Sequence, residues 1–281
     1  MLRHPCFDEK AHREVGRLHL PVAPACNIKC RYCEPDFSCV HESRPGVTSS
    51  VLLPSGVVEY VERALTLEPR IEVIGIAGPG DALANKATFK ALETVREHFP
   101  EKKICLATNG LALPQNVEQL ASLGVEFISV TVNFVEPETG ARVIKGVKTE
   151  GGLAGPEAAR LLLERQLQGI QMAADAGIHI KINTVLIPGI NDHEIDRIAM
   201  LASRAGASLM NILGLIPVGE FAGRRAPGSK EISMARSRAA SYLPQFLSCK
   251  RCRADALGIP GKGDRSLEGM CAAKGGNLLC L

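Results

Sequence analysis

The chain has 281 residues, enough for one large domain or two small ones, and its 46% hydrophobic and 22% charged residues are typical of a globular protein. The net charge of +3 is too small to indicate a nucleic acid or an acidic membrane as a partner. No stretch reaches the roughly 18 uninterrupted apolar residues of a membrane span, and the first residues lack the apolar segment of a signal peptide. We therefore expect a cytoplasmic protein, in which the ten cysteines more often serve as metal ligands or reactive thiols than as disulfides.

Short runs rich in Val, Ile and Leu alternate along the chain with amphipathic stretches, which predicts alternating strands and helices. The predicted strands are residues 17–22, 71–77, 103–108, 127–133, 178–186 and 208–215. The predicted helices are residues 54–67, 84–98, 116–123, 156–176, 192–205 and 229–246.

Six consecutive strand–helix units predict an α/β fold with parallel strands and helices outside them. A closed eight-stranded barrel takes about 250 residues, and extensions at both ends use part of this chain. We therefore expect one domain over residues 1–281, a partial (βα)6 TIM-like barrel; a doubly wound sheet is the alternative. Its core is residues 17–247, and the arm 1–16 and the tail 248–281 would cover the barrel mouth. Glycine-rich residues 145–155 predict a mobile loop, and 250–281 predict an irregular tail.

Three cysteines follow the first predicted strand with the spacing C-x3-C-x2-C: Cys26, Cys30 and Cys33. Thiolates are soft ligands that suit iron–sulfur clusters and zinc. Three thiolates in one loop can bind three irons of a four-iron cluster and leave the fourth iron open to a substrate. A zinc site completed by a fourth protein ligand is the alternative.

The cysteine loop, its Tyr32, and the turn Gly78-Pro79-Gly80-Asp81 after the second predicted strand together resemble the radical S-adenosylmethionine (SAM) enzymes. The resemblance implies a [4Fe-4S] cluster whose open iron binds SAM and whose electron cleaves SAM to a 5′-deoxyadenosyl radical. It also implies that Gly78, Gly80 and Asp81 hold the methionyl part of SAM. Glycine suits this role because a backbone without Cβ atoms lets carbonyl groups approach an ammonium group closely.

Asparagines at or near three predicted strand ends, Asn109, Asn133 and Asn183, are candidates for binding the carboxylate and ribose of SAM. Ordinary strand-end hydrogen bonds are an equal alternative for each of them. Tyr32 precedes the third cysteine directly, and we expect it to lie beside the cofactor.

Other potential ligands lie outside this loop. Cys105 falls within the third predicted strand, where a small core residue is the alternative, and Cys249 and Cys252 have the C-x2-C spacing of a metal chelate. His19 lies in the first predicted strand, where a hydrogen-bonded core histidine is the alternative to an iron ligand. The candidate ligands outside the loop are Cys6, His19, Cys39, Cys105, Cys249 and Cys252.

Five segments occur in the order found in the radical SAM enzymes that build the precursor of the nitrogenase iron–molybdenum cofactor: HLPVAPACNIKCRYC, CVHESRPGV, IAGPGDALAN, CLATNGL and CKRCRADALG. Similarity to this branch implies two further [4Fe-4S] clusters, bound as substrates. We assign one cluster to Cys6, His19 and Cys105 and the other to Cys39, Cys249 and Cys252. Glu42 and Arg44 are then candidate catalytic acid/base and electrostatic groups, and a solvated ion pair is their alternative.

The reaction that this resemblance implies has three stages. One SAM methylates a bridging sulfide, the radical from a second SAM abstracts hydrogen from that methyl group, and a carbide remains inside a fused eight-iron cluster with an added sulfur. Implied partners are cluster donors, a reductant such as ferredoxin or flavodoxin, and a downstream scaffold or carrier protein, with no nucleic acid and no membrane.

Several positions depart from the pattern of this branch. Many members continue into a carrier domain, which we do not expect here, and His41 stands where Asn is expected. Cys271 and Cys280 match no motif. Two other functions fit the residues: a radical SAM enzyme whose extra clusters serve an organic or peptide substrate, and a non-catalytic iron–sulfur or zinc carrier.

Overall fold

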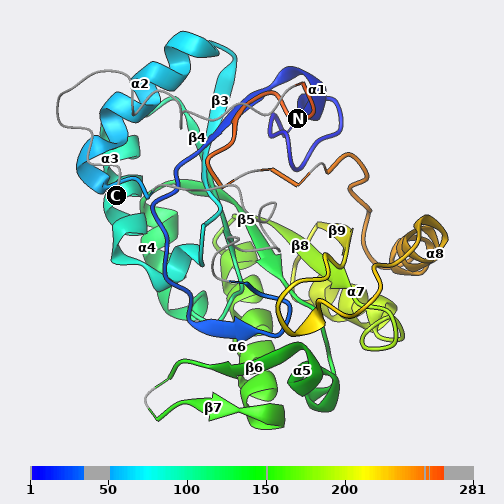
Figure 1. Ribbon diagram of the computed structural model, residues 1–281. Coiled ribbons are helices and arrows are strands. Elements are labelled where there is room, and N and C mark those ends of the chain that lie inside the picture. The colour runs from blue at the N-terminus through cyan, green and yellow to red at the C-terminus, as the bar shows by residue number, and fades with distance from the viewer. Residues whose placement is uncertain (1, 35–50, 150, 250, 253, 263–281) are drawn as a thin grey trace.

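The computed structural model describes residues 2–34, 51–149, 151–249, 251–252 and 254–262 (Figure 1). A seven-stranded sheet of order β10-β1-β3-β4-β5-β8-β9 forms its centre. Six of these strands are parallel and β10 is antiparallel to β1, so the predicted partial barrel of parallel strands is confirmed. The strands are β1 Gly16–His19, β3 Ile71–Ile76, β4 Lys103–Thr108, β5 Val125–Thr131, β8 His179–Leu186, β9 Leu209–Gly214 and β10 Leu257–Gly258.

Helices cover the outer face of the sheet (Figure 1). They are α2 Val57–Leu67, α3 Lys86–His98, α4 Val117–Ser122, α6 Gly155–Asp175, α7 Ile195–Arg204 and α8 Ser229–Ala239, each inside or close to a predicted helix. Two short helices, α1 Ala11–Glu14 and α5 Pro137–Val143, were not predicted. None of the helices in the described ranges is both long enough and apolar enough to cross a bilayer.

The two faces of the sheet differ in chemistry because successive side chains of a strand point to opposite sides. Ile74, Ile128 and Ile182 are buried in the main hydrophobic core under the helices. On the inner face, Cys105 and Lys181 line a pocket instead. Helices on the outside and chain extensions on the inside bury both faces, as parallel strands require.

A second, three-stranded antiparallel sheet corrects the prediction of a mobile loop at residues 145–155. Strand β2 Ile28–Cys30 lies within the cysteine loop and pairs with β6 Ile144–Val147, which in turn pairs with β7 Leu153–Ala154. Turn-forming glycines dominate this segment, and the pairing of β2 with β6 spans over 110 residues, so the local pattern does not reveal it. The hairpin of β6 and β7 therefore supports the cysteine loop (Figure 1).

Two predicted boundaries near the C-terminus were also wrong. Helix α8 ends at Ala239 instead of residue 246, and the chain then runs beside β9, where Met210 N donates to Pro244 O at 2.9 Å and Phe246 N donates to Met210 O at 2.7 Å. Pro244 disfavours helical backbone at the residue before it. The predicted irregular tail contains β10, which pairs with β1 and forms one edge of the sheet.

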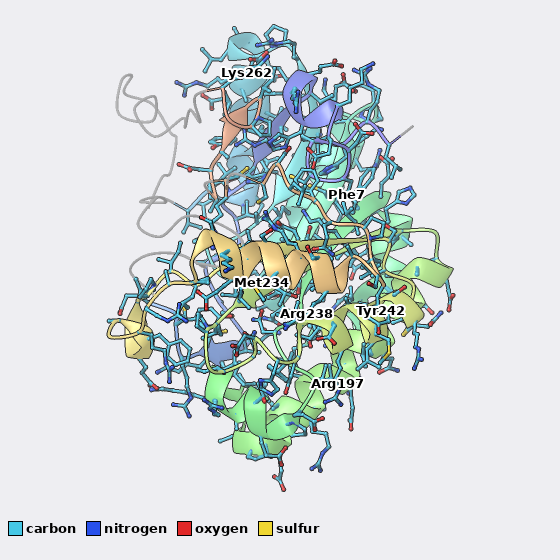
Figure 2. The ribbon with its side chains drawn as sticks, turned by 90° about the vertical axis from the view of Figure 1, so that its right-hand side faces the viewer. Phe7, Arg197, Met234, Arg238, Tyr242 and Lys262 are labelled. Atoms are coloured by element: carbon cyan, nitrogen blue, oxygen red, sulfur yellow. The ribbon has the colours of Figure 1, made fainter. Side chains whose placement is uncertain are left out.

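The N-terminal arm packs against the segment that follows α8. Glu9 accepts a hydrogen bond from Leu247 N at 2.9 Å, and the rings of His12 and Phe246 lie 5.5 Å apart. Figure 2 shows α8 crossing this side of the molecule with Phe7 of the arm above it. The two chain extensions thus lie together against the barrel.

Gln166 of α6 joins the ends of two central strands. It is 1% exposed, and its Nε2 donates to the backbone oxygens of Asn109 and Thr131, each at 2.8 Å. These carbonyls lie at the carboxyl ends of β4 and β5, where parallel α/β folds build their sites. Gln166 therefore fixes the spacing of this edge.

We expect Gln166→Met to lower the free energy of unfolding by about 1–3 kcal/mol, because two buried carbonyl groups lose their donor. Gln171→Met on the same helix is the matched control; Gln171 is exposed and donates to the exposed Asp175 side chain, so its effect should stay within about 0.5 kcal/mol. Urea unfolding of both variants measures the difference. Equal stability of the two variants would contradict the role assigned to Gln166.

Candidate functional site

The three cysteines of the C-x3-C-x2-C motif lie in one loop after β1. Cys30 is buried within β2, Cys26 and Cys33 are partly exposed, and all three are free thiols. Cys33 N donates to Cys30 O at 3.2 Å, which turns the chain between the last two cysteines. The loop thus presents three thiols at the carboxyl edge of the sheet, and their binding of a cluster stays a prediction.

The turn at Gly78-Pro79-Gly80-Asp81 holds this loop by backbone contacts. Gly80 N donates to Ala23 O at 2.6 Å and Asp81 N to Ala25 O at 2.9 Å. A Cβ atom on Gly80 would lie 2.3 Å from Ala25 O, so the close approach requires glycine. The structure therefore shows the turn docking the cysteine loop, and its binding of SAM stays a prediction.

The Asp81 carboxylate lies behind this turn and is 4% exposed. It accepts hydrogen bonds from Asn109 N at 2.6 Å, Leu83 N at 2.9 Å and the Thr108 hydroxyl at 3.0 Å. Burial raises the pKa of Asp81 to about 6, and these hydrogen bonds oppose the rise. The contacts in the structure make Asp81 a brace between the turn and the end of β4.

Asn109 is brought next to the cysteine loop. Its Nδ2 donates to Asn27 Oδ1 at 2.7 Å and lies 3.8 Å from Cys26 Sγ. Its Oδ1 accepts from Leu111 N at 2.9 Å. Asn109 is therefore a side chain that can contact a group bound at Cys26, and Asn27 is a neighbour that the sequence analysis missed.

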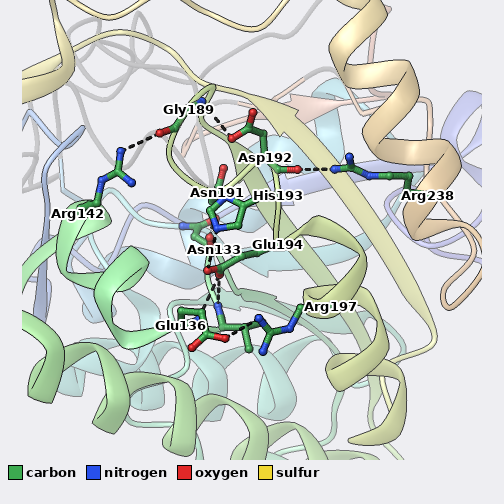
Figure 3. A network of polar contacts seen from close by, with 11 residues as sticks. Asn133, Glu136, Arg142, Gly189, Asn191, Asp192, His193, Glu194, Arg197 and Arg238 are labelled. Carbon is green, nitrogen blue, oxygen red and sulfur yellow. Dashed lines mark hydrogen bonds and ion pairs between the residues drawn. The ribbon is translucent and has the colours of Figure 1, made fainter.

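Asn133 and Tyr32 lie together deeper in the site. Asn133 Nδ2 donates to the Tyr32 hydroxyl at 2.8 Å, and Asn133 Oδ1 accepts from Val185 N at 2.8 Å. Asn191 Nδ2 donates to Asn133 O, and Glu194 accepts from Val135 N at 2.6 Å (Figure 3). These contacts match the strand-end alternative for Asn133 and fix the loops after β5 and β8.

Asn183 lines a pocket on the inner face of the sheet. Its Oδ1 accepts a hydrogen bond from Asn211 Nδ2 at 3.1 Å, and both residues line the pocket. Asn211 is 1% exposed, and its Oδ1 has no hydrogen-bond partner in the described structure. Asn211 is thus a further polar group of the pocket wall, and the sequence analysis missed it.

One pocket on the inner face collects five of the six candidate ligands that lie outside the cysteine loop. We call it the thiol pocket; its lining includes Cys6, His19, Cys105, Cys249 and Cys252. The arm contributes Cys6, β1 and β4 contribute His19 and Cys105, and the segment after α8 contributes the last two cysteines. Residues more than 240 positions apart in the sequence therefore meet inside the barrel.

Gly75 of β3 leaves room for His19 and Cys105 to share this space. A Cβ atom on Gly75 would lie 2.7 Å from Cys105 Sγ and 3.2 Å from Cδ2 of the His19 ring. Both side chains therefore lie over the same glycine, between β1 and β4. The sequence analysis gave a small core residue as the alternative for Cys105 and a hydrogen-bonded core histidine for His19, and the ligand role of both residues stays a prediction.

Burial raises the pKa of every thiol in the site for which a shift is resolved. The pKa of Cys26 rises to about 12, that of Cys30 rises well above its ordinary value, and those of Cys6, Cys33 and Cys105 rise as well. These thiols therefore carry their protons at neutral pH. Because a metal binds the thiolate, loading the site must release protons.

The ligand chemistry fits iron–sulfur clusters. Among the described residues, no group of three His, Cys, Asp or Glu side chains converges on one point as ligands of a single metal ion do. In a four-iron cluster each protein ligand binds a different iron, so thiols spread around a loop suit it. The loop thiols and the adjacent Asn109 therefore fit a cluster with a small polar ligand beside it.

Residues 20–202 match the family model described as the Radical SAM superfamily. Over 260 aligned residues the chain is 45% identical to the FeMo cofactor biosynthesis protein NifB of Methanocaldococcus infernus. The alignment covers 91% of this chain and 85% of that protein. The chain belongs to the NifB family of radical SAM proteins.

A bacterial NifB shows a different coverage. The protein of Klebsiella pneumoniae is 42% identical over 273 residues, which are 94% of this chain but only 58% of that relative. The solved structure of TsrM from Kitasatospora setae, a radical SAM methyltransferase with cobalamin and a [4Fe-4S] cluster bound, has a TM-score of 0.51 and 17% identity. It covers 74% of this chain and 38% of that chain, and it shows a shared fold alone.

Three candidate residues of this NifB-family chain, Cys39, Glu42 and Arg44, lie outside the described residues, as do His41, Cys271 and Cys280. The sequence analysis also missed Lys181 and His4, which line the thiol pocket. A lysine between Ile180 and Ile182 has the period of a half-exposed strand, although Lys181 is 4% exposed. The one sequence feature that could have identified Lys181 as a pocket residue was its position in a strand predicted to be buried on both faces.

We expect the alkylation rate of Cys26 in the metal-free protein to rise about tenfold for each pH unit between pH 8 and pH 10. The thiolate is the nucleophile, and its fraction grows in this way below a pKa of about 12. Iodoacetamide labelling followed by peptide mass spectrometry measures the rate. A short peptide with one exposed cysteine, the control, should level off above its thiol pKa of about 8.5, and a similar levelling for Cys26 would contradict the burial described here.

Proposed function

We propose that this chain is a radical SAM enzyme that inserts a carbide derived from SAM while it fuses two [4Fe-4S] substrate clusters. The product is the eight-iron precursor of the nitrogenase cofactor. The observation that carries the proposal is the thiol pocket, in which Cys6, His19, Cys105, Cys249 and Cys252 meet on the inner face of the barrel. Membership of the NifB family supports it.

Cys26, Cys30 and Cys33 would hold the SAM-binding [4Fe-4S] cluster, whose electron would cleave SAM to a 5′-deoxyadenosyl radical. The chain itself positions this centre. Gly80 docks the cysteine loop, the Asp81 brace orients the end of β4, and Asn109 lies beside Cys26. We keep Gly78, Asn133, Asn183 and Tyr32 as proposed SAM contacts.

The ligands of the substrate clusters divide into two sets in this proposal. Cys6, His19 and Cys105 would bind one cluster; His19 and Cys105 lie over the same glycine, which supports their pairing. Cys39, Cys249 and Cys252 would bind the other, with Glu42 and Arg44 as the acid/base and electrostatic groups. Five of these six ligands line one pocket, which would bring the two clusters close enough to be joined.

Three bonds hold each substrate cluster weakly enough for release, in keeping with its role as a substrate. Neutral imidazole exchanges more readily than thiolate, which suits His19 for a cluster that must leave. The proposal includes a cytoplasmic location, cluster donors, a ferredoxin or flavodoxin as reductant, and a scaffold or carrier protein that receives the product.

Iron counting with SAM turnover tests the proposal. Anaerobically reconstituted protein should hold about twelve irons, four for each of three clusters. After reduction with dithionite it should form 5′-deoxyadenosine and S-adenosylhomocysteine from SAM. Four irons would contradict the substrate clusters, and absence of both products would contradict the enzyme; zinc without iron would favour a carrier.

We expect Cys105→Ala and His19→Ala each to lose formation of the carbide-containing cluster while the EPR signal of the SAM-bound cluster remains. Each substitution removes one of only three bonds to a substrate cluster. His98→Ala, on the exposed end of α3, is the matched control for His19 and should retain full product. An unchanged amount of product in both pocket variants would show that His19 and Cys105 are core residues and not cluster ligands.

A further inference from the structure

A buried lysine lines the thiol pocket. Lys181 is on the inner face of β8, and it is 4% exposed. Its Nζ donates to Cys6 O at 3.3 Å and lies 5.1 Å from the ring centre of Phe7 and 5.7 Å from that of Phe246. The arm and the segment after α8 therefore both contact this ammonium group.

No carboxylate of the described residues forms an ion pair with Lys181. None of the residues that line the thiol pocket in the described structure is Asp or Glu, while Arg251 adds a second cation. A carbonyl oxygen and two aromatic faces compensate a buried ammonium group only in part, and a buried charge without an opposite charge beside it is unfavourable. The wall of the pocket therefore suits an occupant that brings negative charge.

The Lys181 ammonium group interacts electrostatically with the thiols of Cys6 and Cys105. Its charge lowers the pKa of both thiols against the larger effect of burial. When the two residues bind iron they do so as thiolates, and the sulfides of the cluster are further hydrogen-bond acceptors. Lys181 and the proposed cluster ligands thus face one volume from different elements of the fold.

We propose that Lys181 binds the iron–sulfur substrate held by Cys6, His19 and Cys105 and raises its reduction potential. This inference rests on the proposed function, because it needs a cluster in the thiol pocket. A cation beside the cluster stabilises each added electron, and an N–H donor to a cluster sulfur acts in the same direction. Lys181 therefore favours the reduced form of the substrate cluster and holds it on the β8 side of the pocket.

The competing role for Lys181 is structural, as a clamp between Phe7 and Phe246. Lys181→Met keeps the length and the apolar stem but removes the charge, while Lys181→Arg keeps the charge. Lys103→Met is the matched control, because Lys103 also lies over an aromatic ring, 5.8 Å from the centre of Phe127, but does not line the thiol pocket. The potential of the cluster separates charge from packing.

The experiment is an EPR-monitored redox titration of the reconstituted full chain, with the SAM-responsive signal as the internal reference. For Lys181→Met the ratio of reduced to oxidised substrate cluster should fall about tenfold at a fixed potential, which is about 59 mV for one electron. Lys181→Arg should stay within about threefold of the wild type. Lys103→Met and the SAM-responsive signal should not move.

An unchanged ratio in Lys181→Met with wild-type iron content would overturn the role of Lys181 and leave the proposed function standing. A wild-type protein with only four irons would refute both. If Lys181→Met fails to retain the substrate cluster, the iron content of Lys181→Arg decides. Iron at the wild-type level in Lys181→Arg supports the role of the charge. Loss of the substrate-cluster iron in both variants, with the SAM-responsive signal intact, contradicts that role. If Lys181→Met does not fold, a shifted potential in Lys181→Arg contradicts the inference.

Discussion

The alternation of side chains along six parallel strands is the constraint on which the structure depends. One set of side chains, with Ile74, Ile128 and Ile182 among them, forms the core under the helices. The other set points into the barrel, where Cys105 and Lys181 replace aliphatic residues. A shift of one residue in a strand would exchange its two sets of side chains, and in β8 it would place Lys181 in the core. The register that stabilises the fold is therefore the register that assembles the site.

The site is completed by segments that the strands do not supply. The arm brings Cys6, the segment after α8 brings Cys249 and Cys252, and the contact of Glu9 with Leu247 holds the two extensions together. On the carboxyl edge of the sheet, β6 and β7 support the cysteine loop through β2. The barrel strands thus supply His19 and Cys105, and contacts between segments distant in the sequence bring the other ligands to the pocket.

The sequence pattern predicted the frame well, since strand 103–108 matches β4 residue for residue. Hydrophobic runs and Gly or Pro boundaries are local features, and they specify such elements. The hairpin of β6 and β7 was missed because its strands have four and two residues and its glycines favour turns. Two-residue β10 is likewise defined only by its distant partner β1.

For the candidate site, motif spacing identified ligand types but gave no distances. The grouping of His19 with Cys105 over Gly75 needed the pairing of β1, β3 and β4, which no local pattern contains. Lys181 was missed because its local pattern was misleading. Polar and apolar residues alternate around it as they do on a strand with one solvated face. Buried charge at a site breaks the rule that places apolar residues inside, so pattern analysis fails where function requires the exception.

Anomalous scattering at the iron edge from crystals of the reconstituted protein tests the central claim most directly. The account predicts iron beside Cys26, Cys30 and Cys33, and separate iron in the thiol pocket within bonding distance of His19 and Cys105. Iron at the cysteine loop alone, with the imidazole and thiol over Gly75 in contact only with each other, would contradict it.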